Sequence, residues 1–308
     1  MKIKYQFPST DGINTIAAVK WLPEGEPRGI LQITHGMIEY MDRYELFAEY
    51  MTDQGFALFG YDQLGHGDSV KTKEDWGYIG KHPEKLLIYD MQKQREIAEK
   101  EYPNKPYFML GHSMGSYELR KYIAEFGVGL AGAIIMGTGY EPVSATNVGK
   151  ALVKTMEKIR GERHISKMVE GMAFGNLVKK WDFTGEVPTN NWLTKDPEIV
   201  VGYYNEPKTT FKFTLNGYKA LFRLVNYDCR KENVDRIPKE LPCLLISGAL
   251  DPIGAEGKGV RKVYEMFKSA GIQDVGLKLF EDDRHEILNE TNKEEVYQFV
   301  AKWIEDRI

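Results

Sequence analysis

Short apolar runs alternate along much of the chain with longer segments in which apolar residues recur every three to four positions. The short runs predict buried strands, and the recurrence predicts amphipathic helices. Strands are therefore expected at residues 2–7, 15–21, 30–34, 57–61, 107–110, 132–136, 243–247 and 275–280. Helices are expected at residues 44–54, 85–101, 116–126, 260–270 and 293–306. Strands that alternate with helices predict an α/β fold, with a mostly parallel central sheet covered by helices on both faces.

The middle of the chain, residues 141–226, breaks this rhythm. It contains no clear buried strand, is rich in Met, Phe, Trp and Tyr, and has a long loop around W-L-T-K-D-P. Its helical patterns lie at residues 148–159, 166–174 and 217–226. We interpret this segment as a mostly helical cap, inserted into a core that residues 1–140 and 227–308 build together.

The composition is that of an ordinary soluble globular protein. The 308 residues are 42% hydrophobic and 28% charged, with a formal net charge of −4 and the cationic residues spread along the chain. This balance argues against nucleic acid or an anionic membrane surface as the main partner. No run approaches the roughly 20 apolar residues of a membrane span, and the start lacks a signal-peptide pattern. We therefore expect a cytoplasmic protein without stable membrane insertion; its oligomeric state stays open.

The most specific motif is Y-F-M-L-G-H-S-M-G at residues 107–115. Its G-x-S-x-G pattern lies between a predicted strand and a predicted helix, the context that a nucleophile elbow requires. In such an elbow a sharp turn leaves one hydroxyl exposed, here that of Ser113. Gly111 and Gly115 provide the room that the cramped backbone needs. We therefore predict that Ser113 is a nucleophile; the alternative is a serine in an ordinary strand-to-helix turn.

A serine nucleophile needs a base, and the base needs a group that orients it. His285 follows the predicted strand at 275–280, and Asp251 follows the predicted strand at 243–247. Loops at the carboxyl ends of parallel strands open toward the crevice where ligands bind. The order Ser113, Asp251, His285 is also the chain order that accompanies such an elbow. We predict these three residues as nucleophile, orienting carboxylate and base.

Other residues compete for these roles. Asp228, Asp282 and Asp283 are alternatives to Asp251. Asp228 follows no strand signal, and the other two lie too close to His285 in sequence to support its ring from behind. The remaining histidines receive structural or peripheral assignments. His112 is expected beneath the elbow, His35 and His66 in hydrogen-bonded glycine-flanked loops, and His82 and His164 at the surface or in the cap.

Acyl transfer also requires backbone N–H groups that bind the negatively charged oxygen of the transition state. One donor is expected from Met114, the residue after the nucleophile. The second is expected from Met37 in the loop I-T-H-G-M-I-E-Y, where Gly36 lets the backbone come close. The glycine-rich loop at 60–69 lacks the lysine and spacing of a nucleotide-binding loop, so we interpret it as scaffold.

With these residues assigned, the chain resembles the α/β-hydrolase superfamily over essentially its full length. Within it, the chain is similar to the monoacylglycerol lipase and lysophospholipase branch, also described as serine-aminopeptidase-like. The motifs that carry the resemblance are H-G-M-I-E-Y (35–40), Y-D-Q-L-G-H-G-D-S (61–69), G-H-S-M-G-S (111–116), W-L-T-K-D (192–196), S-G-A-L-D-P-I (247–253) and R-H-E-I-L-N-E (284–290). The chain departs from the family pattern at Tyr40, where relatives often have His, and at Gln63, where they often have Arg.

The resemblance implies an α/β-hydrolase fold with a mobile cap over an acyl tunnel. It implies a Ser113–Asp251–His285 triad, with an oxyanion hole from Met37 and Met114 beside a supporting loop. The implied activity is hydrolysis of a monoacyl lipid or similar small-molecule ester, without metal or organic cofactor. The alternatives are a short-chain esterase, an aminopeptidase-like amide hydrolase and a catalytically silent ligand-binding fold. Cys229 and Cys243 are expected to be free thiols.

Overall fold

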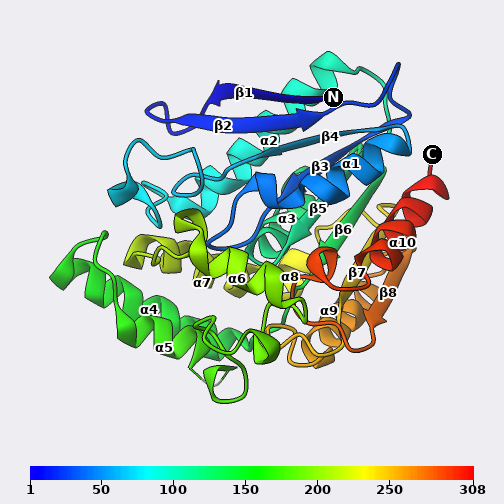
Figure 1. The fold of residues 1–308 in the computed structure, drawn as a ribbon. Helices are drawn as coiled ribbons and strands as arrows, with labels where there is room; N and C mark the ends of the chain where they lie inside the picture. Colours follow the sequence, from blue (N-terminus) through cyan, green and yellow to red (C-terminus); the bar gives the residue numbers. More distant parts are fainter. Residues whose placement is uncertain (176) are drawn as a thin grey trace.

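The computed structural model describes residues 1–175 and 177–308 (Figure 1). Within these residues, eight strands form one sheet in the order β1-β2-β4-β3-β5-β6-β7-β8. The strands are β1 (Lys2–Pro8), β2 (Thr15–Trp21), β3 (Gly29–Thr34), β4 (Phe56–Tyr61), β5 (Tyr107–His112), β6 (Gly132–Met136), β7 (Cys243–Gly248) and β8 (Val275–Phe280). The β1–β2 and β2–β4 pairs are antiparallel and all other neighbours are parallel. The predicted α/β-hydrolase fold with a mostly parallel sheet is confirmed.

Helices cover both faces of the sheet (Figure 1). They are α1 (Glu45–Asp53), α2 (Pro83–Glu101), α3 (Met114–Phe126), α4 (Val143–Arg160), α5 (Lys167–Phe174), α6 (Pro197–Asn205), α7 (Leu215–Asp228), α8 (Lys231–Val234), α9 (Lys258–Ser269) and α10 (Lys293–Glu305). Apolar side chains of α1 and α10 share one buried cluster with the sheet. Side chains of α2, α3, α7 and α9 share the cluster on the other face. Each large apolar side chain buried there contributes about 1.5–3 kcal/mol to folding.

The burial of each strand follows from its place in the sheet. The central strands β3 to β7 are buried along their whole lengths, as their continuous apolar sequences predict for a sheet covered on both sides. The edge strand β1 instead has a mostly exposed or half-buried pattern. Because β3, β5, β6, β7 and β8 run parallel, the loops that follow them emerge at one edge of the sheet.

The chain between β6 and β7 is helical in its described part and contains α4 to α8. In Figure 1, α4 and α5 lie at the end of the molecule opposite β1 and β2. Helix α4 packs against α5 and α7, and α7 also packs against α2 and α3. Helix α7 also contributes to the buried cluster on the face of the sheet that α2, α3 and α9 cover, through Ala220, Leu224 and Val225. The division into a core and a cap at residues 141–226 stays a prediction.

Two helices in this region, α6 and the short α8, were not predicted from the sequence. The chain around W-L-T-K-D-P reads as a long loop, yet α6 begins at Pro197. The Asp196 side chain caps the helix by accepting hydrogen bonds from the N–H groups of Glu198 at 3.0 Å and Ile199 at 3.5 Å. An N-cap Asp followed by Pro is a recognised helix start, so the signal was present in the sequence. In the described residues, no helix has the length and apolar character to cross a membrane.

Candidate active site

Ser113 lies at the sharp turn between β5 and α3, with φ 52° and ψ −116°. A residue other than glycine seldom adopts a positive φ, so the turn is strained. A Cβ atom at Gly111 would lie 2.2 Å from the carbonyl oxygen of Gly115, and one at Gly115 would lie 2.3 Å from that of Thr34. The Ser113 N–H donates to the Met136 carbonyl at 3.0 Å. The glycines of the motif are therefore required by space, and β6 holds the turn in place.

Asp251 and His285 meet at the carboxyl edge of the sheet, from the loops after β7 and β8. The Nδ1 atom of His285 lies 3.0 Å from each carboxylate oxygen of Asp251. The Ser247 hydroxyl and the Ile253 N–H also donate to this carboxylate, at 2.9 Å and 2.8 Å. Burial would raise the pKa of Asp251. The charge of His285, together with the hydrogen bonds that Asp251 accepts from His285, Ser247 and Ile253, instead holds that pKa below its ordinary value. Asp251 is thus an ionised acceptor that fixes the orientation of the ring.

The His285 ring packs beside the elbow. Its Nε2 is buried and has no hydrogen-bond partner among the residues that the structure describes. A Cβ atom at Gly137 would lie 3.2 Å from Cε1 of His285 and 3.2 Å from Cδ2 of His112, the residue before Ser113. The two histidine rings are 4.8 Å apart. The fold therefore brings the loops of Ser113, Asp251 and His285 together, with one imidazole nitrogen unoccupied.

The loop that carries Met37 runs directly against the elbow. A Cβ atom at Gly36 would lie 2.9 Å from Cβ of Ser113. Met114 is the first residue of α3, so its N–H is one of those that lack an intrahelical acceptor. Among residues 1–175 and 177–308, neither the Met37 nor the Met114 N–H donates to another protein group. Both sequence-predicted oxyanion donors thus flank the serine with their N–H groups free.

His35 and His112 support these loops. Nε2 of His35 accepts from the Gln63 N–H at 3.0 Å, while Nδ1 contacts the Gly36 carbonyl at 2.8 Å. Burial lowers the pKa of His35, so it remains a neutral structural bridge. His112 lies beside Glu39, with Nδ1 2.9 Å from Oε1, and its Nε2 lies 3.3 Å from the His285 carbonyl oxygen. Burial opposes its charged form, but Glu39 raises the pKa of His112.

The other histidines are not part of the predicted site. The His66 ring is buried and contacts the rings of His35 at 5.1 Å, Phe211 at 5.5 Å and Phe213 at 5.4 Å, and burial lowers its pKa to about 3. His82 is exposed at the start of α2, and His164 lies between α4 and α5. Within the described part of the chain, no group of three or more His, Cys, Asp or Glu side chains is arranged to hold a metal ion.

A segment between α5 and α6 covers the His285 ring. The Trp192 ring stacks on that of His285 at 4.9 Å, and Phe183 stacks on Trp192 at 4.7 Å. The backbone also joins the two segments, because the Glu286 N–H donates to the Leu193 carbonyl at 2.7 Å. The W-L-T-K-D-P segment was expected to be a long loop, and its contact with His285, about 90 positions away in the chain, was not predicted.

An apolar wall extends from the oxyanion loops. Met37, Ile38 and Met114 belong to a cluster that is separate from the two clusters of the sheet. The other members come from α4, α5, α7 and the segment before α7: Leu152, Val153, Met156, Val169, Ala173, Phe174, Phe211, Phe213, Leu215, Tyr218, Leu221 and Phe222. The groups that would bind a carbonyl oxygen therefore lie next to a buried and half-buried cluster of aliphatic and aromatic side chains.

Comparisons with known proteins agree with this architecture. The profile of the serine aminopeptidase, S33 family matches residues 25–292. A human monoglyceride lipase is 26% identical over 294 residues, which cover 93% of this chain and 86% of that protein. An uncharacterised abhydrolase domain-containing protein of Dictyostelium discoideum is 27% identical over 308 residues; the chain spans only 28% of its length. A solved carboxyl esterase of Bacillus coagulans, in complex with glycerol, superimposes with a TM-score of 0.90 at 27% identity, covering 99% of this chain and 98% of that one.

Proposed function

Because the chain belongs to the serine aminopeptidase, S33 family and is an esterase- and lipase-like α/β-hydrolase, we propose that it hydrolyses carboxylic esters through Ser113, His285 and Asp251. One observation carries this proposal. The His285 ring is held by an ionised aspartate at Nδ1 and leaves Nε2 free, and the ring packs on His112, the residue before Ser113. A ring fixed at one nitrogen and free at the other is the arrangement that a general base for a serine nucleophile needs.

The reaction proceeds in two steps. Nε2 of His285 accepts the Ser113 proton as the hydroxyl oxygen attacks the ester carbonyl carbon. The N–H groups of Met37 and Met114 bind the resulting oxyanion, and Asp251 stabilises the imidazolium. The imidazolium then gives its proton to the departing alcohol, which leaves an acyl-enzyme. A water molecule that His285 deprotonates attacks this ester, releases the acid and returns the proton to Ser113.

The proposed substrate is a monoacyl lipid or a similar ester with a long apolar arm. The apolar wall beside Met37 and Met114 supports this choice, since it would remove an acyl chain from water at about 25 cal/mol per Å². The name of the human relative, a monoglyceride lipase, points the same way. A short-chain esterase would not need a wall of this extent.

The charges near the site favour an ester over a peptide with a free amino terminus. Binding an ammonium group requires an available carboxylate. Glu39 and Glu286, one from each of the loops beside Ser113 and His285, are both ion-paired with Arg43, and Asp283 of the His285 loop is ion-paired with Lys195. An aminopeptidase-like reaction therefore ranks second, in spite of the family's name.

Labelling and turnover test the nucleophile. The protein is treated with a fluorophosphonate probe and assayed with p-nitrophenyl esters. Ser113→Ala should abolish labelling and lower turnover about 10⁶-fold, as loss of a serine nucleophile does. Ser269→Ala, which changes an exposed serine at the end of α9, is the matched control and should behave as wild type. Full turnover by Ser113→Ala would refute the proposed nucleophile.

Substrate length tests the lipid assignment. Turnover is measured for p-nitrophenyl esters of increasing acyl length, then for a monoacylglycerol and a lysophospholipid side by side, with a p-nitroanilide for amide cleavage. We expect kcat/KM to rise with acyl length, about tenfold for each one to two methylenes buried. A flat response beyond short chains would indicate a small-molecule esterase, and preferred anilide cleavage would indicate an amide hydrolase.

A further inference from the structure

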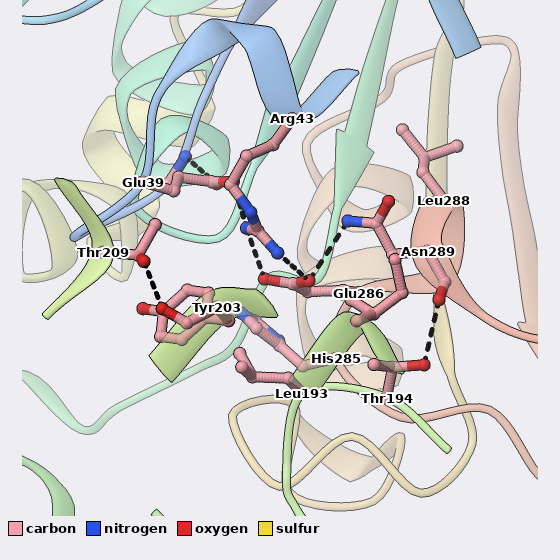
Figure 2. Close-up of polar contacts among 12 residues, drawn as sticks. Glu39, Arg43, Leu193, Thr194, Tyr203, Thr209, His285, Glu286, Leu288 and Asn289 are labelled. Atoms are coloured by element: carbon pink, nitrogen blue, oxygen red, sulfur yellow. Dashed lines mark hydrogen bonds and ion pairs between the residues drawn. The ribbon is translucent and has the colours of Figure 1, made fainter. Parts of the chain in front are cut away.

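Arg43, Glu39 and Glu286 form a buried cluster of charged side chains behind the active-site loops (Figure 2). Arg43 binds Glu286 in a bidentate manner, with Nη1–Oε1 2.7 Å and Nη2–Oε2 2.6 Å. Its Nη1 also lies 2.9 Å from Oε2 of Glu39, whose Oε1 contacts His112. The side chains of Arg43, Glu39 and Glu286 are only 11%, 4% and 4% exposed. Arg43 thus balances two carboxylates away from water, and one of these carboxylates also contacts a histidine ring.

This cluster connects the two loops that the proposed reaction uses. Glu39 accepts a hydrogen bond from the N–H of Gly36, the residue before Met37, so its carboxylate shapes the oxyanion loop. Glu286 directly follows His285, and its Oε2 also accepts a hydrogen bond from the Asn289 side-chain amide at 3.1 Å. Arg43 is the one member that contacts both carboxylates, and through them it joins loops separated by more than 240 positions in the chain.

The segment above the site also contacts Arg43. The Tyr203 ring of α6 lies against the guanidinium group, 4.9 Å from its carbon to the ring centroid. The Tyr203 hydroxyl donates to the Ile38 carbonyl at 3.0 Å, inside the same oxyanion loop. The planar guanidinium is therefore fixed on one face by an aromatic ring and along its edges by two carboxylates. A lysine ammonium cannot reproduce this geometry, because it is a point charge without a planar fork.

We propose that Arg43 is a positioning residue that sets the distance between the oxyanion-hole loop and the His285 loop. The inference rests on the proposed function, because it assigns Arg43 a part in the same reaction. Arg43 touches neither the substrate nor the reacting atoms, and it acts through Glu39 and Glu286. If it were removed, the oxyanion donors and the base could shift relative to each other. A misplacement of about 1 Å in such groups lowers the rate by about 100-fold.

Arg43→Ala and Arg43→Lys test the inference against a matched control. Arg223→Ala removes an arginine that binds both oxygens of Glu84, at 3.0 Å and 2.9 Å, and joins α7 to α2 away from the site. Folding is checked by circular dichroism, and active sites are counted from the final fluorophosphonate stoichiometry. Per labelled site, Arg43→Ala should lower kcat about 10- to 100-fold and slow labelling by a similar factor, with KM within about threefold. Arg223→Ala should keep the kcat of wild type.

Chemical rescue separates positioning from general stability. Millimolar guanidinium chloride should restore part of the labelling rate of Arg43→Ala, whereas sodium chloride at equal ionic strength should not. The double variant Arg43→Ala/Glu286→Gln should lose no more activity than Arg43→Ala, since both residues act through one contact. If Arg43→Ala does not fold, Arg43→Lys, which keeps the charge without the fork, should show the same kcat loss of about tenfold.

The outcomes distinguish this inference from the proposed function. An unchanged kcat per labelled site in Arg43→Ala or Arg43→Lys, with wild-type ester turnover intact, would overturn the positioning role alone. Equal losses in Arg43→Ala and Arg223→Ala would also overturn it, because they would indicate general destabilisation. Wild-type protein that neither labels nor turns over an ester would instead refute the proposed function.

Discussion

Asp251 and Asp228 are both buried, yet their surroundings lead to opposite charge states. Their exposed fractions are 0% and 2%. Asp251 accepts hydrogen bonds from Ser247, Ile253 and His285, and its pKa is lowered. The carboxylate oxygens of Asp228 have no hydrogen-bond partner in the described residues, and Nε of Arg120 lies 3.8 Å away. Burial raises the pKa of Asp228 to about 8, although Arg120 opposes this.

The comparison shows that depth alone does not prepare a carboxylate for orienting a histidine. Burial by itself favours the neutral acid, and only donors aimed at the oxygens keep the group ionised. The cation beside Asp228 is used elsewhere, since Arg120 donates to Thr138 and to the Gly139 carbonyl at 3.2 Å and 3.0 Å. Asp228 was an alternative for the orienting role from the sequence, and this difference favours Asp251.

The largest effect on kcat is expected when the ionised Asp251 is replaced by a neutral amide. Asp251→Asn should lower kcat by about 10⁴-fold, because a neutral amide no longer fixes the ring tautomer or stabilises the imidazolium. Asp228→Asn should keep kcat within about twofold, since that residue is neutral near pH 7 already. Steady-state turnover of a p-nitrophenyl ester measures both. Comparable losses in the two variants would show that the two aspartates do not differ in the way described.

A smaller effect is expected from removing one donor to Asp251. Ser247→Ala deletes the 2.9 Å hydrogen bond to the carboxylate, and a bond to a charged group contributes about 1.5–3 kcal/mol. We expect kcat/KM to fall about tenfold. The pKa of Asp251 should rise toward its ordinary value once this donor is lost. Steady-state turnover of a p-nitrophenyl ester checks the loss, with Ser269→Ala as the control; an unchanged kcat/KM would contradict the role given to Ser247.

Asp228 is expected to have the smallest effect on activity, but it should make the free energy of unfolding depend on pH. Its folded-state pKa, about 8, lies above the ordinary aspartate value of 3.8, so the folded protein keeps a proton that the unfolded chain releases. The free energy of unfolding should therefore decrease as pH rises through this window, by up to about 1.4 kcal/mol per pH unit from this group. Asp228→Asn should flatten that dependence in urea titrations at pH 5, 6.5 and 8. Parallel pH curves for the variant and wild type would show that Asp228 is ionised.

Much of the architecture could be predicted because its signals are local. The predicted strands at 15–21, 132–136 and 275–280 coincide with β2, β6 and β8. The G-x-S-x-G motif predicts its own tight turn, since the glycine contacts lie within a few residues of Ser113 or in the adjacent strand. The loops of Asp251 and His285 could be placed together because parallel strands end at a common edge.

The contacts that surround the site could not be predicted in this way. Arg43 and Glu286 are separated by 243 positions, and nothing in the spacing of either residue indicates the other. Trp192 lies on the His285 ring, although its own segment has no periodic pattern. Such contacts depend on how loops from distant strands and the segment between α5 and α6 pack.

Side-chain periodicity and local steric limits on the backbone were enough to predict the alternation of strands and helices in the core, the glycine-lined turn at Ser113 and the loops of Asp251 and His285. The folded arrangement was needed to establish which buried aspartate is ionised, which nitrogen of His285 is free, and that Arg43 connects the two loops. Those properties depend on desolvation and on donors brought within about 3 Å by residues far apart in the chain, and no local pattern encodes such distances.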